Sequence, residues 1–300
     1  ADKAMVRRQF RARESGQQVD YITDHPETIA YEGDERELTV IFTDFAGFTS
    51  LSERMGGRET VALLNQYMRG ITDVLLDSGA YVNKFLGDGI MAFWGAPAPD
   101  PHHAEHACVS VLDGYNVLHV LNDRRAELGD QSPLGMRAGI STGHVIVGDC
   151  GAPPKLNDYT VIGNAVNLAA RLESANKLLG TQVLVTKRTM ELISTEKREA
   201  MLWRPIGQLR VVGQDEPATA FELLGRKGEN IDTPETTRWI DDSALAVRTF
   251  QDGDYATSME LWQKLLLQER GHAGALMYVQ RCAELLQSGA TDPVLPLRSK

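Results

Sequence analysis

Asp44 is the first residue whose type and surroundings suggest chemistry. It follows residues 37–42, an apolar and β-branched stretch that predicts a strand, and it precedes residues 47–50, which open a predicted helix. A carboxylate at a strand end can hold a hard cation, while the free N–H groups at a helix start face an anion. This combination suits a metal-bound polyphosphate. The simpler alternative is that Asp44 only caps the helix.

Asp88 is the second candidate carboxylate, in the turn Leu86–Gly89 between predicted strands at 80–85 and 90–94. If the strand beside this turn pairs with the one that ends at Asp44, the two acids converge. Two carboxylates holding metal ions about 3.5–4 Å apart form a clamp that many enzymes use on phosphoryl groups. The alternative is that Asp next to Gly is simply a good turn pair.

Asn167 and Arg171 lie four positions apart on a predicted helix over residues 164–177, so they share one helix face. An amide and a guanidinium arranged in this way could hold a ribose and a phosphate. The alternative is an ordinary exposed pair on an amphipathic helix.

The elements that must position these residues alternate between strands and helices. Helices are predicted at 58–77, from Pro101 to about Leu128, at 164–177 and at 187–193, and further strands at 136–147, 159–162, 182–186, 209–212 and 219–224. This order predicts an α+β fold, with a ferredoxin-like βαββαβ core sheet flanked by helices.

The C-terminal part adds a small all-α segment. Residues 241–287 are helical in pattern and look like a tetratricopeptide-type helix pair plus a third helix. One such unit cannot bury its own apolar face, so we expect it to pack on the large domain, on a protein partner or on further sequence. The predicted boundaries are a linker and helix stub at 1–36, a large domain at 37–226, a linker at 227–240, helices at 241–290 and a tail at 291–300.

The composition is ordinary, with 42% hydrophobic and 24% charged residues. A formal net charge of -10 argues against a nucleic-acid binder, and the absence of an apolar run of about 18 residues argues against a membrane segment. Three widely separated cysteines predict a reducing, cytoplasmic location. Because the chain begins at Ala1, we expect a piece of a longer protein, which an upstream domain could attach to a membrane.

Four segments together carry a specific resemblance. In order and spacing, FTDFAGFTSLSE, NKFLGDGIMAFWG, MRAGISTGHVIVGDCG and YTVIGNAVNLAARLE resemble the catalytic domain of class III nucleotidyl cyclases, over about residues 37–225. The resemblance implies two Mg²⁺ or Mn²⁺ ions on Asp44 and Asp88, with the Phe45 carbonyl as an extra ligand. It also implies that substrate contacts the backbone of Phe45, Ala46, Gly47, Phe48 and Thr49.

The remaining roles that the resemblance implies concern the nucleotide. Asn167 would orient the ribose, Arg171 would stabilise transition-state charge on the phosphate, and Arg137 would bind phosphate as a second arginine. Lys84 and Thr160 match the pair that reads the base. In this family the acids come from one subunit and the base-reading pair, Asn and Arg from the other, which implies a homodimer with shared sites.

The base-reading pair favours ATP. A lysine only donates hydrogen bonds, which suits N1 of adenine, and Thr160 can accept from the adenine 6-amino group. Guanine-specific relatives carry an acidic residue where Lys84 stands. The resemblance therefore implies an adenylyl cyclase, in which the ribose 3′-oxygen attacks the α-phosphorus in line and pyrophosphate leaves. The alternatives are a guanylyl cyclase and a catalytically weak nucleotide-sensing domain.

Two further features bear on the resemblance. A Lys and Thr pair resembles the bicarbonate-responsive subclass, so a bicarbonate response is a hypothesis. Many relatives place a phosphate-binding lysine where Val212 stands in this chain, and Arg210 is the nearest substitute. This departure concerns the pyrophosphate contacts and the turnover they support.

Overall fold

The computed structural model describes Asp24 and residues 33–129, 133–152, 156–212, 214, 216–267 and 272–297. Most of the predicted N-terminal linker and helix stub lies outside these residues. The described chain forms two compact units. The first comprises residues up to Met136 together with Ile140–Ala169, and the second comprises Arg137–Gly139 together with residues from Ala170 onward.

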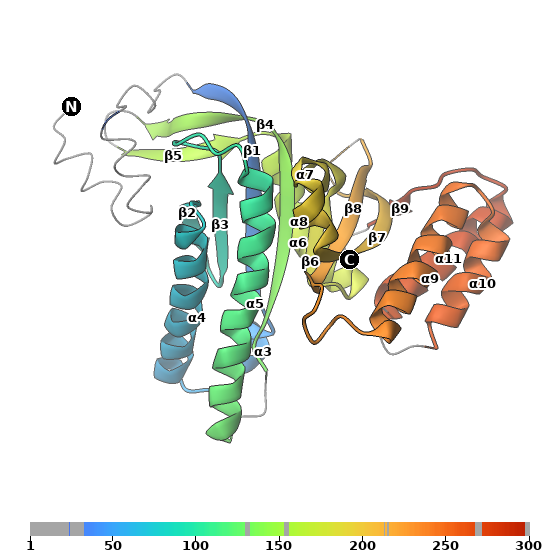
Figure 1. The fold of residues 1–300 in the computed structure, drawn as a ribbon, viewed down its shortest axis with the longest axis horizontal. Helices are drawn as coiled ribbons and strands as arrows, with labels where there is room; N and C mark the ends of the chain where they lie inside the picture. Colours follow the sequence, from blue (N-terminus) through green and yellow to red (C-terminus); the bar gives the residue numbers. More distant parts are fainter. Residues whose placement is uncertain are drawn as a thin grey trace. The chain divides into compact units, whose positions relative to one another are not determined.

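The first unit contains the predicted βαββαβ core. Its elements are β1 (Asp34–Ala46), α3 (Phe48–Ser52), α4 (Gly57–Asp77), β2 (Tyr81–Leu86), β3 (Gly89–Trp94), α5 (His103–Glu127), β4 (Gly135–Ala152) and β5 (Leu156–Ile162). The strand order is β2-β3-β1-β4, with β5 paired to β4. Figure 1 shows α4 and α5 side by side, and they pack against β1, β2 and β3. The predicted α+β class and core are confirmed.

Periodic apolar residues explain the helix α4. Leu63, Tyr67, Ile71 and Leu75 are buried at four-residue intervals, which places them on one face of the helix. Gly79 follows with φ +85°, a left-handed conformation that suits glycine and ends the helix before β2.

The second unit is built on the strand order β6-β8-β7-β9. Its elements are β6 (Val183–Thr186), α7 (Lys187–Leu192), α8 (Thr195–Glu199), β7 (Met201–Arg210), β8 (Ala218–Arg226) and β9 (Leu295–Pro296), and α6 (Asn164–Leu179) leads into it from the first unit. The predicted strand at 209–212 was wrong at both ends, since β7 begins at Met201 and ends at Arg210. Pro205 and Gly207 weaken the strand pattern, and the structure accommodates them at a register shift.

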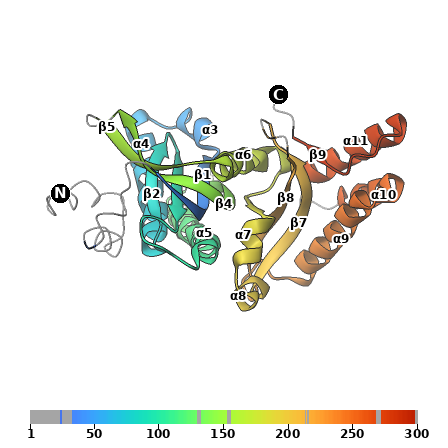
Figure 2. The same cartoon turned by 90° about the horizontal axis from the view of Figure 1, so that it is seen from above.

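Three helices follow, α9 (Pro234–Gln251), α10 (Tyr255–Leu265) and α11 (His272–Ser288), which Figure 2 shows side by side. Residues 234–240, predicted as linker, are helical because the Thr233 hydroxyl accepts from the Thr236 N–H (3.1 Å) and Pro234 suits the first helical turn. The predicted tail also contains β9, which pairs in parallel with β7. The predicted domain boundaries and the tetratricopeptide-like assignment stay predictions.

The C-terminal helices pack on the sheet of their own unit, which is one of the options expected for them. The Trp262 ring stacks on Tyr278 at 4.4 Å, and the Tyr278 hydroxyl donates to the Ile206 carbonyl in β7. The Arg204 guanidinium in turn lies 4.4 Å from the Trp239 ring of α9. Aromatic side chains therefore bury the face that an isolated helix pair would leave exposed.

Replacing Glu222 with glutamine is expected to lower the free energy of unfolding by about 3–5 kcal/mol, because Arg204 would keep a buried charge without its counter-ion. Glu222 Oε2 lies 2.7 Å from Arg204 Nη2, and the two side chains are only 6% and 4% exposed. Urea unfolding measured by circular dichroism tests this expectation.

The matched control is Glu191→Gln, because the Glu191 carboxylate lies 3.5 Å from Lys187 Nζ in an exposed pair. Its loss is expected to cost less than about 0.5 kcal/mol. Equal costs for the two variants would contradict the importance of the buried pair.

Candidate active site

The pairing of β1 with β3 brings the two predicted metal ligands together. Thr43 is paired with Ile90, so Asp44 follows on β1 while Asp88 lies in the turn two residues before Ile90 of β3. A Cβ on Gly89 would lie 2.6 Å from the Thr43 carbonyl oxygen, so only glycine permits this close approach of the turn. The N-cap position of α3 is occupied by Gly47, three residues after Asp44.

The oxygen ligands that Asp44, Asp88 and the Phe45 carbonyl offer fit a hydrated magnesium ion that is bound together with phosphates. The described residues contain no cluster of three or more His, Cys, Asp or Glu side chains that could enclose a metal. Mg²⁺ needs no such cluster, because it is commonly held by one or two carboxylates together with substrate phosphates and water. Phe45 can add only its carbonyl oxygen, since its ring is buried and stacked on Tyr67 at 4.3 Å.

The predicted base-reading pair is brought together by β2 and β5. Thr160 Oγ1 donates to Asn83 Oδ1 at 3.2 Å, and Asn83 immediately precedes Lys84. Asn83 is fully buried, and its Nδ2 donates to the Tyr159 carbonyl oxygen at 2.6 Å. A register shift between Val82 and Lys84 makes Asn83 the extra residue of a bulge. Lys84 and Thr160 are therefore linked through one buried amide.

Asp158 is a contact of Lys84 that the sequence interpretation missed. Its Oδ2 lies 3.2 Å from Lys84 Nζ, with both side chains partly exposed. Alternation along β5 accounts for this placement, since Tyr159 points into the core, 5.3 Å from the Tyr81 ring, and its two neighbours point the other way. The signal available in the sequence was the two-residue spacing between Asp158 and Thr160.

The acidic character of this region extends to β4. Asp149 is paired with Tyr159 in the β4–β5 register, next to the pair of Cys150 and Asp158. Burial raises the pKa of Asp149, and the nearby Asp158 charge raises it further. The Lys84 ammonium, 3.2 Å from Asp158 Oδ2, lies on the Asp158 side of this acidic pair.

The remaining predicted residues belong to α6 and β4. Asn167 and Arg171 are both exposed and lie one turn apart on α6, as the spacing predicted. Arg137 is partly buried, with its Nε 3.7 Å from Glu173 Oε1. The ion pair restricts the Arg137 side chain to the neighbourhood of α6.

Val212, the departure from the family pattern, lies next to Arg171. A cavity of about 110 Å³ is lined by Arg171, Ser174, Ala175, Leu178, Val211, Val212 and Leu297. Position 212 therefore presents an isopropyl group where a lysine would place a cation. Arg210 is engaged elsewhere, because its Nη1 lies 3.2 Å from Asp292 Oδ2, which also binds Arg281 at 2.7 Å.

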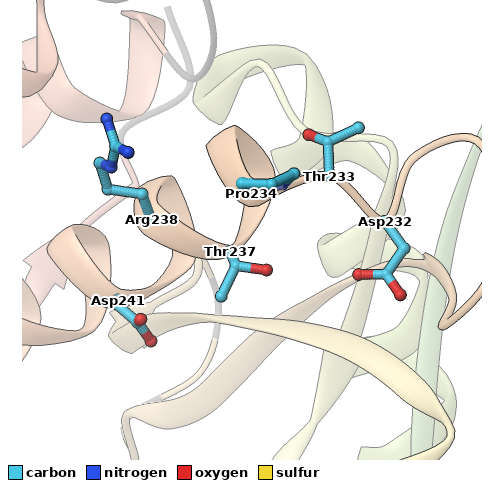
Figure 3. Close-up of a pocket in the computed structure, with 6 residues that line it drawn as sticks. All are labelled: Asp232, Thr233, Pro234, Thr237, Arg238 and Asp241. Carbon is cyan, nitrogen blue, oxygen red and sulfur yellow. The ribbon is translucent and has the colours of Figure 1, made fainter.

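A second hollow lies at the start of α9. It has a volume of about 560 Å³ and is lined by Asp232, Thr233, Pro234, Thr237, Arg238 and Asp241. Figure 3 shows Thr237 and Asp241 on one side of the helix and Arg238 pointing away from them. Asp232 accepts a hydrogen bond from the Gly228 N–H at 2.8 Å. None of the predicted site residues lines this hollow, so we assign no nucleotide to it.

Comparison with known proteins decides the family. The model of the adenylate and guanylate cyclase catalytic domain matches residues 30–223. The chain belongs to this family. Adenylate cyclase 1 of Rhizobium meliloti (strain 1021) is 34% identical over 190 residues, which is 63% of this chain and 28% of that protein. The chain thus spans little more than a quarter of that relative, and the family match ends before α9.

Solved structures agree with the cyclase fold. The adenylyl cyclase CyaB from P. aeruginosa is 32% identical with a TM-score of 0.56, covering 65% of this chain and 97% of that one. The guanylyl cyclase Cya2 is 31% identical with a TM-score of 0.57, covering 66% and 96%. Because both kinds of cyclase are similar to this cyclase domain to the same degree, overall likeness leaves the purine open. In the described part of the chain, no helix combines the length and apolarity needed to span a bilayer.

Proposed function

We propose that this chain is an adenylyl cyclase that converts ATP to cyclic AMP and pyrophosphate. The observation that carries the proposal is the linked pair of Lys84 and Thr160, which offers a donor and an acceptor side by side. Adenine presents the complementary pattern, an acceptor at N1 and a donor at the 6-amino group. Guanine presents the reverse pattern at both positions, so both contacts would be mismatched.

The reaction proposed is an in-line attack of the ribose 3′-oxygen on the α-phosphorus, with pyrophosphate as the leaving group. Two divalent cations held by Asp44 and Asp88, with the Phe45 carbonyl, would supply positive charge at the phosphates and acidify the 3′-hydroxyl. Asn167 orients the ribose by hydrogen bonding, and the Arg171 guanidinium stabilises charge that develops on the α-phosphoryl oxygens. Arg137 and the backbone of residues 45–49 position the other phosphates.

We also propose that two copies of the chain share each site. The carboxylates Asp44 and Asp88 would come from one protomer, and Lys84, Thr160, Asn167 and Arg171 from its partner. Since every chain carries both sets, a two-fold symmetric dimer would contain two equivalent sites. The cytoplasmic location, the bicarbonate response and a protein partner for α9–α11 stay predictions.

Purine preference tests the proposed activity. The purified chain is incubated with ATP or GTP and Mn²⁺, and the cyclic nucleotide product is quantified. We expect kcat/KM to be about 10- to 100-fold higher for ATP, because each mismatched contact leaves a polar group unpaired. Equal or preferred use of GTP would favour the guanylyl cyclase alternative. Nucleotide binding without product from either substrate would favour the weak nucleotide-sensing domain.

A further inference from the structure

Asn83 has a defined amide orientation. Its Nδ2 donates to the Tyr159 carbonyl oxygen at 2.6 Å, and the whole side chain is buried. The flipped amide would place Oδ1 against that carbonyl, so two acceptors would face each other without a proton between them. The buried amide therefore has to present Oδ1, an acceptor, on its other side.

The orientation of Asn83 determines what Thr160 can offer to a ligand. The Thr160 hydroxyl lies 3.2 Å from Asn83 Oδ1 and donates its proton there. A hydroxyl carries one proton, so only the oxygen lone pairs of Thr160 stay available for a further hydrogen bond. Thr160 is then an acceptor toward the substrate. It can pair with a 6-amino group and cannot pair with a 6-oxo group.

We propose that Asn83 is a specificity-determining positioning residue, which fixes Thr160 as a hydrogen-bond acceptor and so selects 6-aminopurine nucleotides. The inference rests on the proposed adenylyl cyclase function and deepens it. Asn83 itself does not touch the substrate. The β2 bulge turns its side chain inward, and the following Lys84 is held beside Asp158 at 3.2 Å. One buried residue thus sets the hydrogen-bonding character of one half of the base-reading pair.

Three triphosphates that differ at position 6 of the purine test the proposal. They are ATP, purine riboside triphosphate, which has no 6-substituent, and ITP, which has a 6-oxo group. Their dissociation constants are measured by competition against a fluorescent nucleotide, so that no turnover is needed. The unaltered protein is expected to bind ATP about 5- to 10-fold more tightly than purine riboside triphosphate, as one neutral hydrogen bond predicts.

Asn83→Val should leave this ratio nearly unchanged, because the released Thr160 hydroxyl can still accept a hydrogen bond from the 6-amino group. The ratio of ATP affinity to ITP affinity should instead fall about 5- to 10-fold in this variant, because the Thr160 hydroxyl could rotate and donate to the 6-oxo group of ITP. Asn83→Asp retains an acceptor for Thr160, so it should keep the ratio between ATP and ITP, although it places a carboxylate against the Tyr159 carbonyl. Asn83→Ala, which removes the acceptor with less bulk, replaces Asn83→Val if that variant does not fold.

Asn176 provides a matched control because it makes the same kind of contacts elsewhere. It is fully buried, donates to the Ala138 carbonyl at 2.9 Å and accepts from Thr181 Oγ1 at 2.7 Å. Asn176→Val should lower stability without changing the ratio between ATP and ITP. A ratio that falls equally in both Asn variants would mean that general loss of packing is responsible.

The proposal is overturned if Asn83→Val keeps the full ratio between ATP and ITP while Thr160→Val loses it, since Thr160 would then act without Asn83. Thr160→Val and the double variant Asn83→Val/Thr160→Val should lose the ratio to the same extent. Failure of the proposed function has a different signature. In that case the unaltered protein forms no cyclic AMP or binds ITP as well as ATP, whatever residue occupies position 83.

Discussion

Asp44→Asn is expected to lower kcat for cyclic AMP formation by about 100- to 1000-fold. Losses of this size are typical when an enzyme loses one group that stabilises charge in the transition state. The asparagine keeps the size of the side chain but removes the negative charge that would hold the cation. Asp88→Asn should have a similar effect, and the double variant should be little worse than either single variant, because the two carboxylates act as a unit. Initial rates at saturating ATP and Mn²⁺ measure these losses.

Asp73→Asn is the control for this experiment, because Asp73 is exposed on α4 and has no predicted role in the site. Its kcat should stay within about twofold of the unaltered protein, as for most surface substitutions. The apparent affinity for Mn²⁺ should fall in the Asp44 and Asp88 variants and not in the control. Near-normal turnover of Asp44→Asn at low Mn²⁺ would argue that the cation binds elsewhere.

Mixing two inactive variants is expected to restore activity. Asp44→Ala removes a metal ligand and Asn167→Ala removes the ribose contact, so each homodimer would contain two defective sites. Random exchange gives half heterodimers, each with one site built entirely from intact halves, so the mixture should recover about a quarter of the unaltered activity. Cyclic AMP is measured after the two proteins have been incubated together long enough for subunit exchange.

The control mixture combines Asp44→Ala with Asp88→Ala. Both changes affect the same half of the site, so every site in the heterodimer lacks a carboxylate and no activity should return. Exchange itself is monitored by energy transfer between labelled chains. If exchange occurs and the Asp44→Ala and Asn167→Ala mixture stays inactive, the site is complete within one chain and the shared-site proposal fails.

Strong periodicity made the core of the first unit predictable. Residues 58–77 repeat apolar side chains at helical spacing, and α4 was observed at Gly57–Asp77. The sequence also predicted the hairpin around Asp88, because Gly and Asp at a turn between two apolar strands are a clear local signal. Both features depend on neighbouring residues alone, which is why the sequence was sufficient.

Features that depend on pairing with distant residues were missed. The strand β7 contains Pro205 and Gly207, which the sequence alone does not suggest for a strand interior, and a register shift accommodates them. The strand β9 is two residues long and exists because Leu295 pairs with Leu209. No local pattern encodes either of these partners.

The candidate site also contains some residues that the sequence predicted and others that only the structure identified. The family motifs pointed to Lys84 and Thr160, but they said nothing of Asn83, whose role depends on a bulge and on a hydrogen bond to another strand. Asp158 was equally invisible as the partner of Lys84, since their contact at 3.2 Å joins β2 to β5. Sequence motifs therefore identified the groups expected to touch the nucleotide, and the structure identified the groups that orient them.

The most direct test of the account is the position of manganese in crystals grown with Mn²⁺ and 3′-deoxy-ATP, an analogue that lacks the attacking hydroxyl. We expect anomalous scattering between the Asp44 and Asp88 carboxylates of one protomer, with the adenine against the partner's Lys84. Nucleotide bound with manganese away from both carboxylates would contradict the account, as would an adenine bound far from Lys84 and Thr160.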